Sequence, residues 1–83
     1  MYYVYVLRSK KNEKQYIGFT KKAPEERLQE HNYGANVFTK NSRPFKLIYW
    51  EEYKDKAFAQ KRELFLKSGN GRNFLKKKIA ADL

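Results

Sequence analysis

The chain of 83 residues contains no cysteine, only four glycines and two prolines, and a single histidine. Without thiols it forms neither disulfides nor thiolate metal sites, so the fold must depend on packing. No apolar run is long enough to span a membrane, and the chain begins on a strand-like pattern without a basic leader. We therefore expect one domain, residues 1–83, in a cytoplasmic protein that has no membrane partner.

Acidic residues are also scarce, with nine Asp and Glu against 19 Lys and Arg and a net charge of +10. A surface of this sign attracts polyanions through Coulomb forces and counterion release. Seven Tyr, six Phe and one Trp add flat faces on which bases can stack. Nucleic acid, either DNA or RNA, is the predicted partner, and the alternative is that the charge serves only solubility.

Two strands begin the chain. Residues Tyr2 to Leu7 and Gln15 to Thr20 are rich in β-branched and aromatic side chains, and the polar run between them predicts a hairpin. If Ser9 pairs with Lys14, the phenols of Tyr5 and Tyr16 become diagonal neighbours on one face. The other face is then apolar, with Val4, Val6, Ile17 and Phe19.

Three helices and a third strand follow the hairpin. Pro24 and two acids indicate a helix start, and Gly34 is a plausible end. Residues 35–43 form a basic loop, Phe45 to Tyr53 is a third strand, and helices are predicted from Lys56 to Lys67 and from Arg72 to Ala81. The fold class is α+β, a small three-stranded antiparallel sheet with the order hairpin, helix, strand, helix, helix. We expect the helices to cover one face of the sheet.

The two later helices have predicted caps and faces. Asp55 is expected to cap the first of them and Asn70 the second. Glu63 falls at the edge of the expected apolar arc of the first of these helices, where a side chain is neither buried nor fully exposed. That arc comprises Ala57, Phe58, Leu64, Phe65 and Leu66. In the last helix, Phe74, Leu75 and Ile79 are expected to face inward.

The stretch from Tyr16 to His31 is the candidate site. It collects a phenol, a glycine, a hydroxyl, an arginine and the only histidine within sixteen residues, and most of these are poor choices for a dry core. Arg27 and His31 are four residues apart and therefore share one side of a helix, which Leu28 must anchor. The alternative is an exposed, solvated helix without a function.

In their order along the chain these residues resemble the GIY-YIG endonuclease domain, in particular small stand-alone members similar to the N-terminal nuclease domain of the C component of the bacterial excinuclease ABC, a DNA repair enzyme. The first motif corresponds to Tyr3-Val4-Tyr5, with Tyr3 in place of the usual glycine, and the second to Tyr16-Ile17-Gly18. Further matching positions are Thr20, Arg27, His31, His31-Asn32-Tyr33-Gly34, Glu63, Arg43-Pro44 and Gly69-Asn70-Gly71-Arg72. Asn70 and Asn73 are both candidates for an asparagine that larger members use.

The resemblance implies a metal-dependent nuclease. Tyr5 or Tyr16 would be the general base, Arg27 would bind the phosphate and His31 would donate to it or relay a proton. Glu63 is an oxygen ligand suited to Mg²⁺ or Mn²⁺, whereas zinc is disfavoured by one His and no Cys. Further substrate contacts are expected from Thr20, Lys21, Lys40, Arg43 and Arg72.

Three hypotheses follow. The first is an endonuclease that cuts structured or damaged DNA, with a protein partner supplying specificity. The second is a noncatalytic nucleic-acid-binding module of the same fold, and the third is a basic adaptor for an acidic protein. Glu63 distinguishes the first two hypotheses, because a lone carboxylate at a phosphate site would repel a nucleic acid that the protein binds without cutting.

Overall fold

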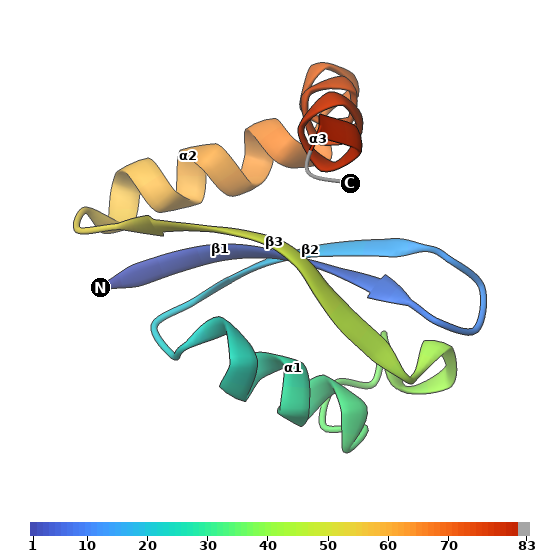
Figure 1. Ribbon diagram of the computed structural model, residues 1–83. Helices are drawn as coiled ribbons and strands as arrows, with labels where there is room; N and C mark the ends of the chain where they lie inside the picture. The colour runs from blue at the N-terminus through green and yellow to red at the C-terminus, as the bar shows by residue number, and fades with distance from the viewer. Residues whose placement is uncertain (82–83) are drawn as a thin grey trace.

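The computed structural model of the protein describes residues 1–81, and its centre is a three-stranded antiparallel sheet with the strand order β2-β1-β3 (Figure 1). The element order confirms the predicted α+β class. No helix within residues 1–81 is both long and apolar enough to cross a membrane. The elements are β1 (Tyr2–Ser9), β2 (Gln15–Thr20), α1 (Pro24–Asn32), a short 3-10 turn η1 (Lys40–Ser42), β3 (Phe45–Tyr53), α2 (Lys56–Lys67) and α3 (Gly69–Ala81).

The hairpin of β1 and β2 has the predicted register. The amide of Ser9 donates to the carbonyl of Lys14 at 2.8 Å. Tyr5 lies opposite Gly18 and Leu7 opposite Tyr16. Side chains alternate along a strand, so Tyr5 and Tyr16 are diagonal neighbours on one face of the sheet, as expected.

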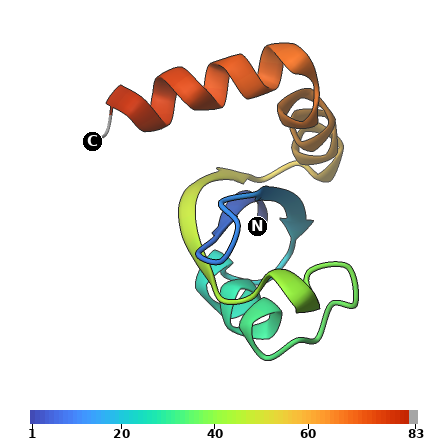
Figure 2. The ribbon, with the colours of Figure 1, turned by 90° about the vertical axis from the view of Figure 1, so that its right-hand side faces the viewer.

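Helices cover both faces of the sheet, so the expectation that they cover one face is wrong. Helix α1 packs below the sheet in Figure 1, while α2 and α3 lie above it, and Figure 2 shows the same three layers from the side. The cause is the central strand, in which residues 4–7 are all at most 3 % exposed and therefore need cover on each side. One core combines Val4, Val6, Ala59, Leu66 and Leu75, and the other combines Tyr5, Leu7 and Phe45 with the partly buried Tyr16, Leu28 and Leu47.

The side of helix α2 that packs against the sheet is not the predicted apolar arc. Ala59 and Leu66, two turns apart, are fully buried, whereas Phe58 is 63 % and Leu64 67 % exposed. The small side chain of Ala59 lets the helix approach the sheet closely, and Glu63 lies between the two buried positions on this side. Of the expected arc, only Leu66 belongs to the core.

Helix α3 begins three residues earlier than predicted and has a different cap. The Ser68 hydroxyl accepts a hydrogen bond from the amide of Gly71 at 3.2 Å, so Ser68 takes the capping role that we expected of Asn70. The Asp55 side chain caps α2 as predicted, accepting from the amide of Phe58 at 3.1 Å. The inward residues of α3 are confirmed, since Leu75 is buried and two partly buried side chains, Phe74 and Ile79, pack against the same core.

Candidate active site

One pocket of about 240 Å³ opens at the outer edge of β2. Its wall includes all five of the residues for which the sequence predicts a catalytic role, contributed by four different elements. They are Tyr5 from β1, Tyr16 from β2, Arg27 and His31 from α1, and Glu63 from α2. The pocket therefore spans the edge strand, because α1 and α2 lie on opposite faces of the sheet.

Gly18 allows the phenol of Tyr5 to reach this edge. Tyr5 stands on the central strand directly opposite Gly18, and its ring extends across the position where another residue would carry its Cβ. A Cβ built there would lie 2.3 Å from both Cζ and Oη of Tyr5, far inside van der Waals contact. A glycine at position 18 is therefore a requirement of packing, and the hydroxyl of Tyr5 enters the pocket because of it.

Buried hydrogen bonds connect Tyr5, His31 and Thr39. His31 Nε2 lies 3.2 Å from the Tyr5 hydroxyl, His31 Nδ1 lies 2.7 Å from the Thr39 hydroxyl, and Thr39 Oγ1 is 3.4 Å from the Asn36 carbonyl. A carbonyl only accepts, so we assign the Thr39 hydrogen to Asn36, the Nδ1 hydrogen to Thr39 and the Tyr5 hydrogen to Nε2. In this assignment the neutral imidazole accepts from Tyr5.

Burial sets the protonation states of these hydrogen-bonded side chains. It raises the pKa of the Tyr5 phenol above its ordinary value, and the nearby Arg27 cation opposes the rise. Burial, with Arg27 acting in the same direction, lowers the pKa of His31. At neutral pH Tyr5 therefore keeps its proton and His31 is uncharged, so a free phenolate is not the resting state of the site.

Arg27 is held in place by an acid that the sequence did not single out. Its Nη1 donates to Glu30 at 2.7 Å, and Lys22 pairs with the other oxygen of the same carboxylate. The hydrogen bonds from Lys22 and Arg27 lower the pKa of Glu30, so this carboxylate stays ionised. About a quarter of the Arg27 side chain is exposed, which leaves its remaining N–H groups available to an anion in the pocket.

Among the residues that the structure describes, Glu63 is the only carboxylate on the pocket wall. Its side chain is 21 % exposed and lies 3.4 Å from the ammonium of Lys67, one turn later on α2. Both ring nitrogens of His31 already take part in hydrogen bonds, so His31 is not available to coordinate a metal ion. Residues 1–81 contain no cluster of three or more His, Cys, Asp or Glu that could hold a metal ion. This donor set fits Mg²⁺ or Mn²⁺, which bind through one carboxylate when water and phosphate fill the other positions.

Tyr16 lies on the outer side of the pocket. Its hydroxyl donates to the carbonyl of Phe38 at 3.2 Å, and its ring meets that of Phe45 edge to face. Phe38 also lines the pocket, yet its side chain is 84 % exposed. The two phenols thus differ in environment, Tyr5 being buried against His31 and Tyr16 being close to solvent.

The five residues predicted to contact substrate do not share one location. None of the five lies on the pocket wall, and of the five only Arg72 lines the hollow that adjoins the pocket. The Thr20 hydroxyl accepts from the amide of Lys22, and the ammonium of Lys21 lies 5.7 Å from the ring centre of Tyr2. The side chains of Lys40 and Arg43 lie near Gly34, just after the end of α1.

Thr39, Asn36 and Glu30 were not predicted as parts of the site. Thr39 is 1 % exposed although it lies in a polar, basic loop, and the sequence gives no sign that it would be buried against a histidine. Glu30 could have been noticed, because an acid three residues after Arg27 on a helix is well placed to pair with it.

A three-stranded α+β fold with this pocket at its edge strand has the architecture of a small nuclease domain. The profile of the family described as "GIY-YIG catalytic domain" matches residues 1–78, and the chain belongs to the GIY-YIG family. This is a family of nucleases, and membership in it implies a nucleic-acid substrate.

Two relatives are similar over most of their length. A UPF0213 protein of Clostridium perfringens is 40 % identical over 68 residues, which is 81 % of this chain and 71 % of the relative. A UPF0213 protein of Staphylococcus haemolyticus is 36 % identical over 76 residues, 90 % of each chain. No solved structure matches the chain with significance.

Proposed function

We propose that the protein is a metal-dependent endonuclease that hydrolyses phosphodiester bonds in DNA, with structured or damaged DNA as its substrate. The observation that supports this proposal is the convergence of two phenols, a guanidinium, an imidazole and a carboxylate in one pocket. The net charge of +10 and the family membership support a nucleic-acid substrate.

Arg27 binds the scissile phosphate in this proposal. The guanidinium presents several N–H donors in a plane and stays charged at every relevant pH. As the attacking oxygen approaches, negative charge accumulates on the phosphoryl oxygens, and a fixed cation stabilises that charge more strongly in the transition state than in the ground state. Glu30 holds the guanidinium in position beforehand.

Tyr5 accepts a proton from the nucleophilic water and passes its own proton to His31. The hydroxyl of Tyr5 lies 3.2 Å from Nε2, which is free to accept. The water loses one proton to Tyr5 Oη, Tyr5 loses one to Nε2, and the resulting hydroxide attacks phosphorus, so the phenol is neutral before and after the transfer. This relay explains how a tyrosine with a raised pKa acts as base at neutral pH.

Glu63 holds the divalent cation, Mg²⁺ or Mn²⁺. When bound, this ion stabilises negative charge on the phosphate and on the departing oxygen. Tyr16, with its hydroxyl on the outer side of the pocket, orients the substrate or the water. Lys67 balances the charge of Glu63 from the same helix.

The role of Glu63 is tested by a nicking assay on supercoiled, flapped, bulged and plain duplex DNA with Mg²⁺ and Mn²⁺. We expect Glu63→Gln to reduce cleavage by more than about a hundredfold, because the ligand charge is lost, while DNA affinity stays equal or rises. Glu52→Gln, on the exposed side of β3, is the matched control and should cut like the wild type. Wild-type protein that nicks none of these substrates would refute the proposal.

The relay is tested with Tyr5→Phe and His31→Gln. Each should reduce the cleavage rate by about 10²–10⁴-fold at neutral pH, since each removes the path for the proton. Tyr33→Phe, at a phenol that is 84 % exposed, is the matched control. Wild-type rates in Tyr5→Phe would exclude Tyr5 as the base and leave Tyr16 for that role.

The second candidate function is a noncatalytic nucleic-acid-binding module. The contact between Glu63 and Lys67 favours it, because an ammonium already occupies one side of the carboxylate. A binding module would retain affinity for DNA without cutting it and would not respond to Mn²⁺. Measuring binding and cleavage on the same DNA with the same protein preparation separates the two functions.

A further inference from the structure

The pocket does not end at Glu63 but continues along β2. A larger hollow of about 580 Å³ shares Tyr16 and Ile17 with it, and a third of about 360 Å³ shares Gln15 and Arg72 with the second. We call the second and third hollows together the β2 groove. The β2 groove is lined by Arg8, Lys14, Gln15, Tyr16, Ile17, Lys67, Arg72, Lys76, Ile79 and Ala80.

The charge of the β2 groove has one sign. Within residues 1–81, five of its lining residues are cations and none is acidic, whereas the pocket beside it holds Glu63. Among residues 1–81, only Lys67 of these five cations takes part in an ion pair, and its partner is Glu63. Five cations beside one another repel, so an anionic ligand that lies between them relieves the repulsion.

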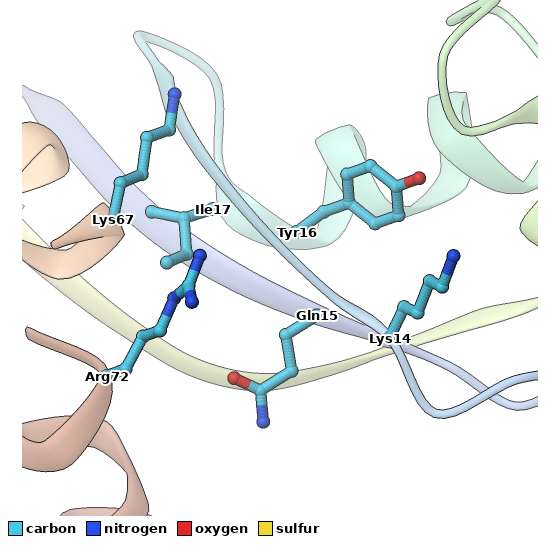
Figure 3. Close-up of a pocket in the computed structure, with 6 residues that line it drawn as sticks. All are labelled: Lys14, Gln15, Tyr16, Ile17, Lys67 and Arg72. Carbon is cyan, nitrogen blue, oxygen red and sulfur yellow. The ribbon is translucent and has the colours of Figure 1, made fainter. Parts of the chain in front are cut away.

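The walls of the groove come from opposite sides. Figure 3 shows Lys67 and Arg72 extending from the helices on one side, and Lys14, in the turn before β2, and Tyr16, in β2, extending on the other. Tyr16 and Ile17 point to opposite faces of this edge strand, and each adds apolar surface to the hollow on its own side, Tyr16 with its aromatic ring. Positive charge with an interposed aromatic face is the combination by which proteins hold the backbone and bases of a single strand.

The size of the groove selects against a duplex. Hollows of 300–1,000 Å³ hold ligands of drug size, so the 580 Å³ hollow and the 360 Å³ hollow each hold about one or two nucleotides. Hollows of this volume accommodate single nucleotides and not the paired cross-section of a double helix. An unpaired strand passes through and remains connected to the scissile phosphate in the pocket.

We propose that the β2 groove binds an unpaired segment of nucleic acid next to the scissile bond, so that the preferred substrate carries a single-stranded flap or gap at the cleavage position. This inference rests on the proposed function and adds the substrate class to it. An acidic peptide also matches the charge of the groove, but it lacks flat bases to lie against Tyr16.

The test measures binding of a fluorescein-labelled oligothymidylate by anisotropy over a range of salt concentrations, in EDTA so that nothing is cut. For a single strand, the slope of log K against log salt is about 0.7 per neutralised phosphate. We expect Arg72→Gln and Lys14→Gln each to lower the slope by about this amount and to weaken binding about fivefold at 0.1 M salt. Arg8→Gln with Lys76→Gln should lower it by twice as much.

Lys46→Gln and Lys54→Gln are the matched controls, because both lysines are exposed and line none of the three hollows. Their binding and salt slope should equal those of the wild type, and circular dichroism checks that every variant is folded. If the controls weaken binding as much as Arg72→Gln does, the attraction is diffuse and the groove assignment is wrong. Competition by polyglutamate as effective as that by oligothymidylate would also overturn it.

Cleavage assays keep this inference separate from the proposed function. We expect a flapped duplex to be cut faster than the same duplex without a flap, and Arg72→Gln to reduce the ratio of these two cleavage rates. A protein that binds oligothymidylate through the groove but cuts nothing refutes the endonuclease and supports the groove. A protein that cuts, with Arg72→Gln identical to wild type on both substrates, refutes the groove alone.

Discussion

Substitution of Gly18 by alanine tests whether the approach of Tyr5 to β2 builds the pocket. The new Cβ would lie 2.3 Å from Cζ and Oη of Tyr5, whereas carbon atoms in contact stay about 3.5–4.0 Å apart, so the ring must move by more than about 1 Å. Tyr5 is 3 % exposed and bonded to His31, so the move strains a packed core and breaks that hydrogen bond.

The magnitude follows from these two effects. Overpacking a core costs about 1–3 kcal/mol and a lost hydrogen bond about 0.5–1.5 kcal/mol. Alanine also lowers the conformational entropy of the unfolded chain, which stabilises the folded state by about 0.4–1 kcal/mol. Gly18→Ala should therefore reduce the free energy of unfolding by about 0.5–4 kcal/mol and lower the melting temperature by a few degrees or more.

Urea unfolding followed by circular dichroism and by the fluorescence of Trp50, the only tryptophan, measures the effect. Gly69→Ala is the matched control, because a Cβ there meets nothing within 4 Å, and it should be neutral or slightly stabilising. In a Tyr5→Leu background the cost of Gly18→Ala should fall sharply, since the obstructing ring is gone. Equal stability of Gly18→Ala and Gly69→Ala would refute the argument.

Three further predictions concern other parts of the molecule. Gly71→Ala should destabilise the protein by more than about 1 kcal/mol in urea unfolding, because its Cβ would lie 1.9 Å from a backbone carbonyl oxygen of α2 that cannot rotate away. The pKa of His31 is lower in the folded protein than in the unfolded chain. The stability that neutral His31 contributes is therefore complete above about pH 6.5 and is lost as the pH falls through the pKa of the folded state. Melting temperatures measured between about pH 7 and 5 should show this decline. Burial, followed by the hydrogen bond to Glu51, raises the pKa of Tyr49 to about 12, and the same two causes raise that of Tyr53 to about 12. Their contribution to stability should be present below pH 10 and lost between about pH 10 and 12, and absorbance at alkaline pH should show these two phenols ionising after the exposed ones.

The sheet was predictable because its signal is local. Alternation and the length of the loop between Ser9 and Lys14 fix the hairpin register, and the register alone brings Tyr5 and Tyr16 to one face. The convergence of five side chains from four elements was predicted from family resemblance, since no local pattern relates Glu63 to a strand more than forty residues earlier.

The errors arose where packing between layers decides the outcome. The side that α2 presents was misjudged because its larger apolar residues stay in solvent while the small Ala59 meets the sheet. The two-sided covering of the sheet depends on the central position of β1, which the sequence of one strand does not reveal. Burial of Thr39 against His31 likewise depends on the path of a loop whose composition is polar.

The two helical layers are held by different cores, and the pocket draws on both of them. During synthesis, a chain that ends before α2 already carries Tyr5, Tyr16, Arg27 and His31, but it lacks Glu63. In the proposed mechanism such a chain binds nucleic acid without cutting it. If this mechanism holds, cleavage would begin only after α2 has been made and has packed against the sheet.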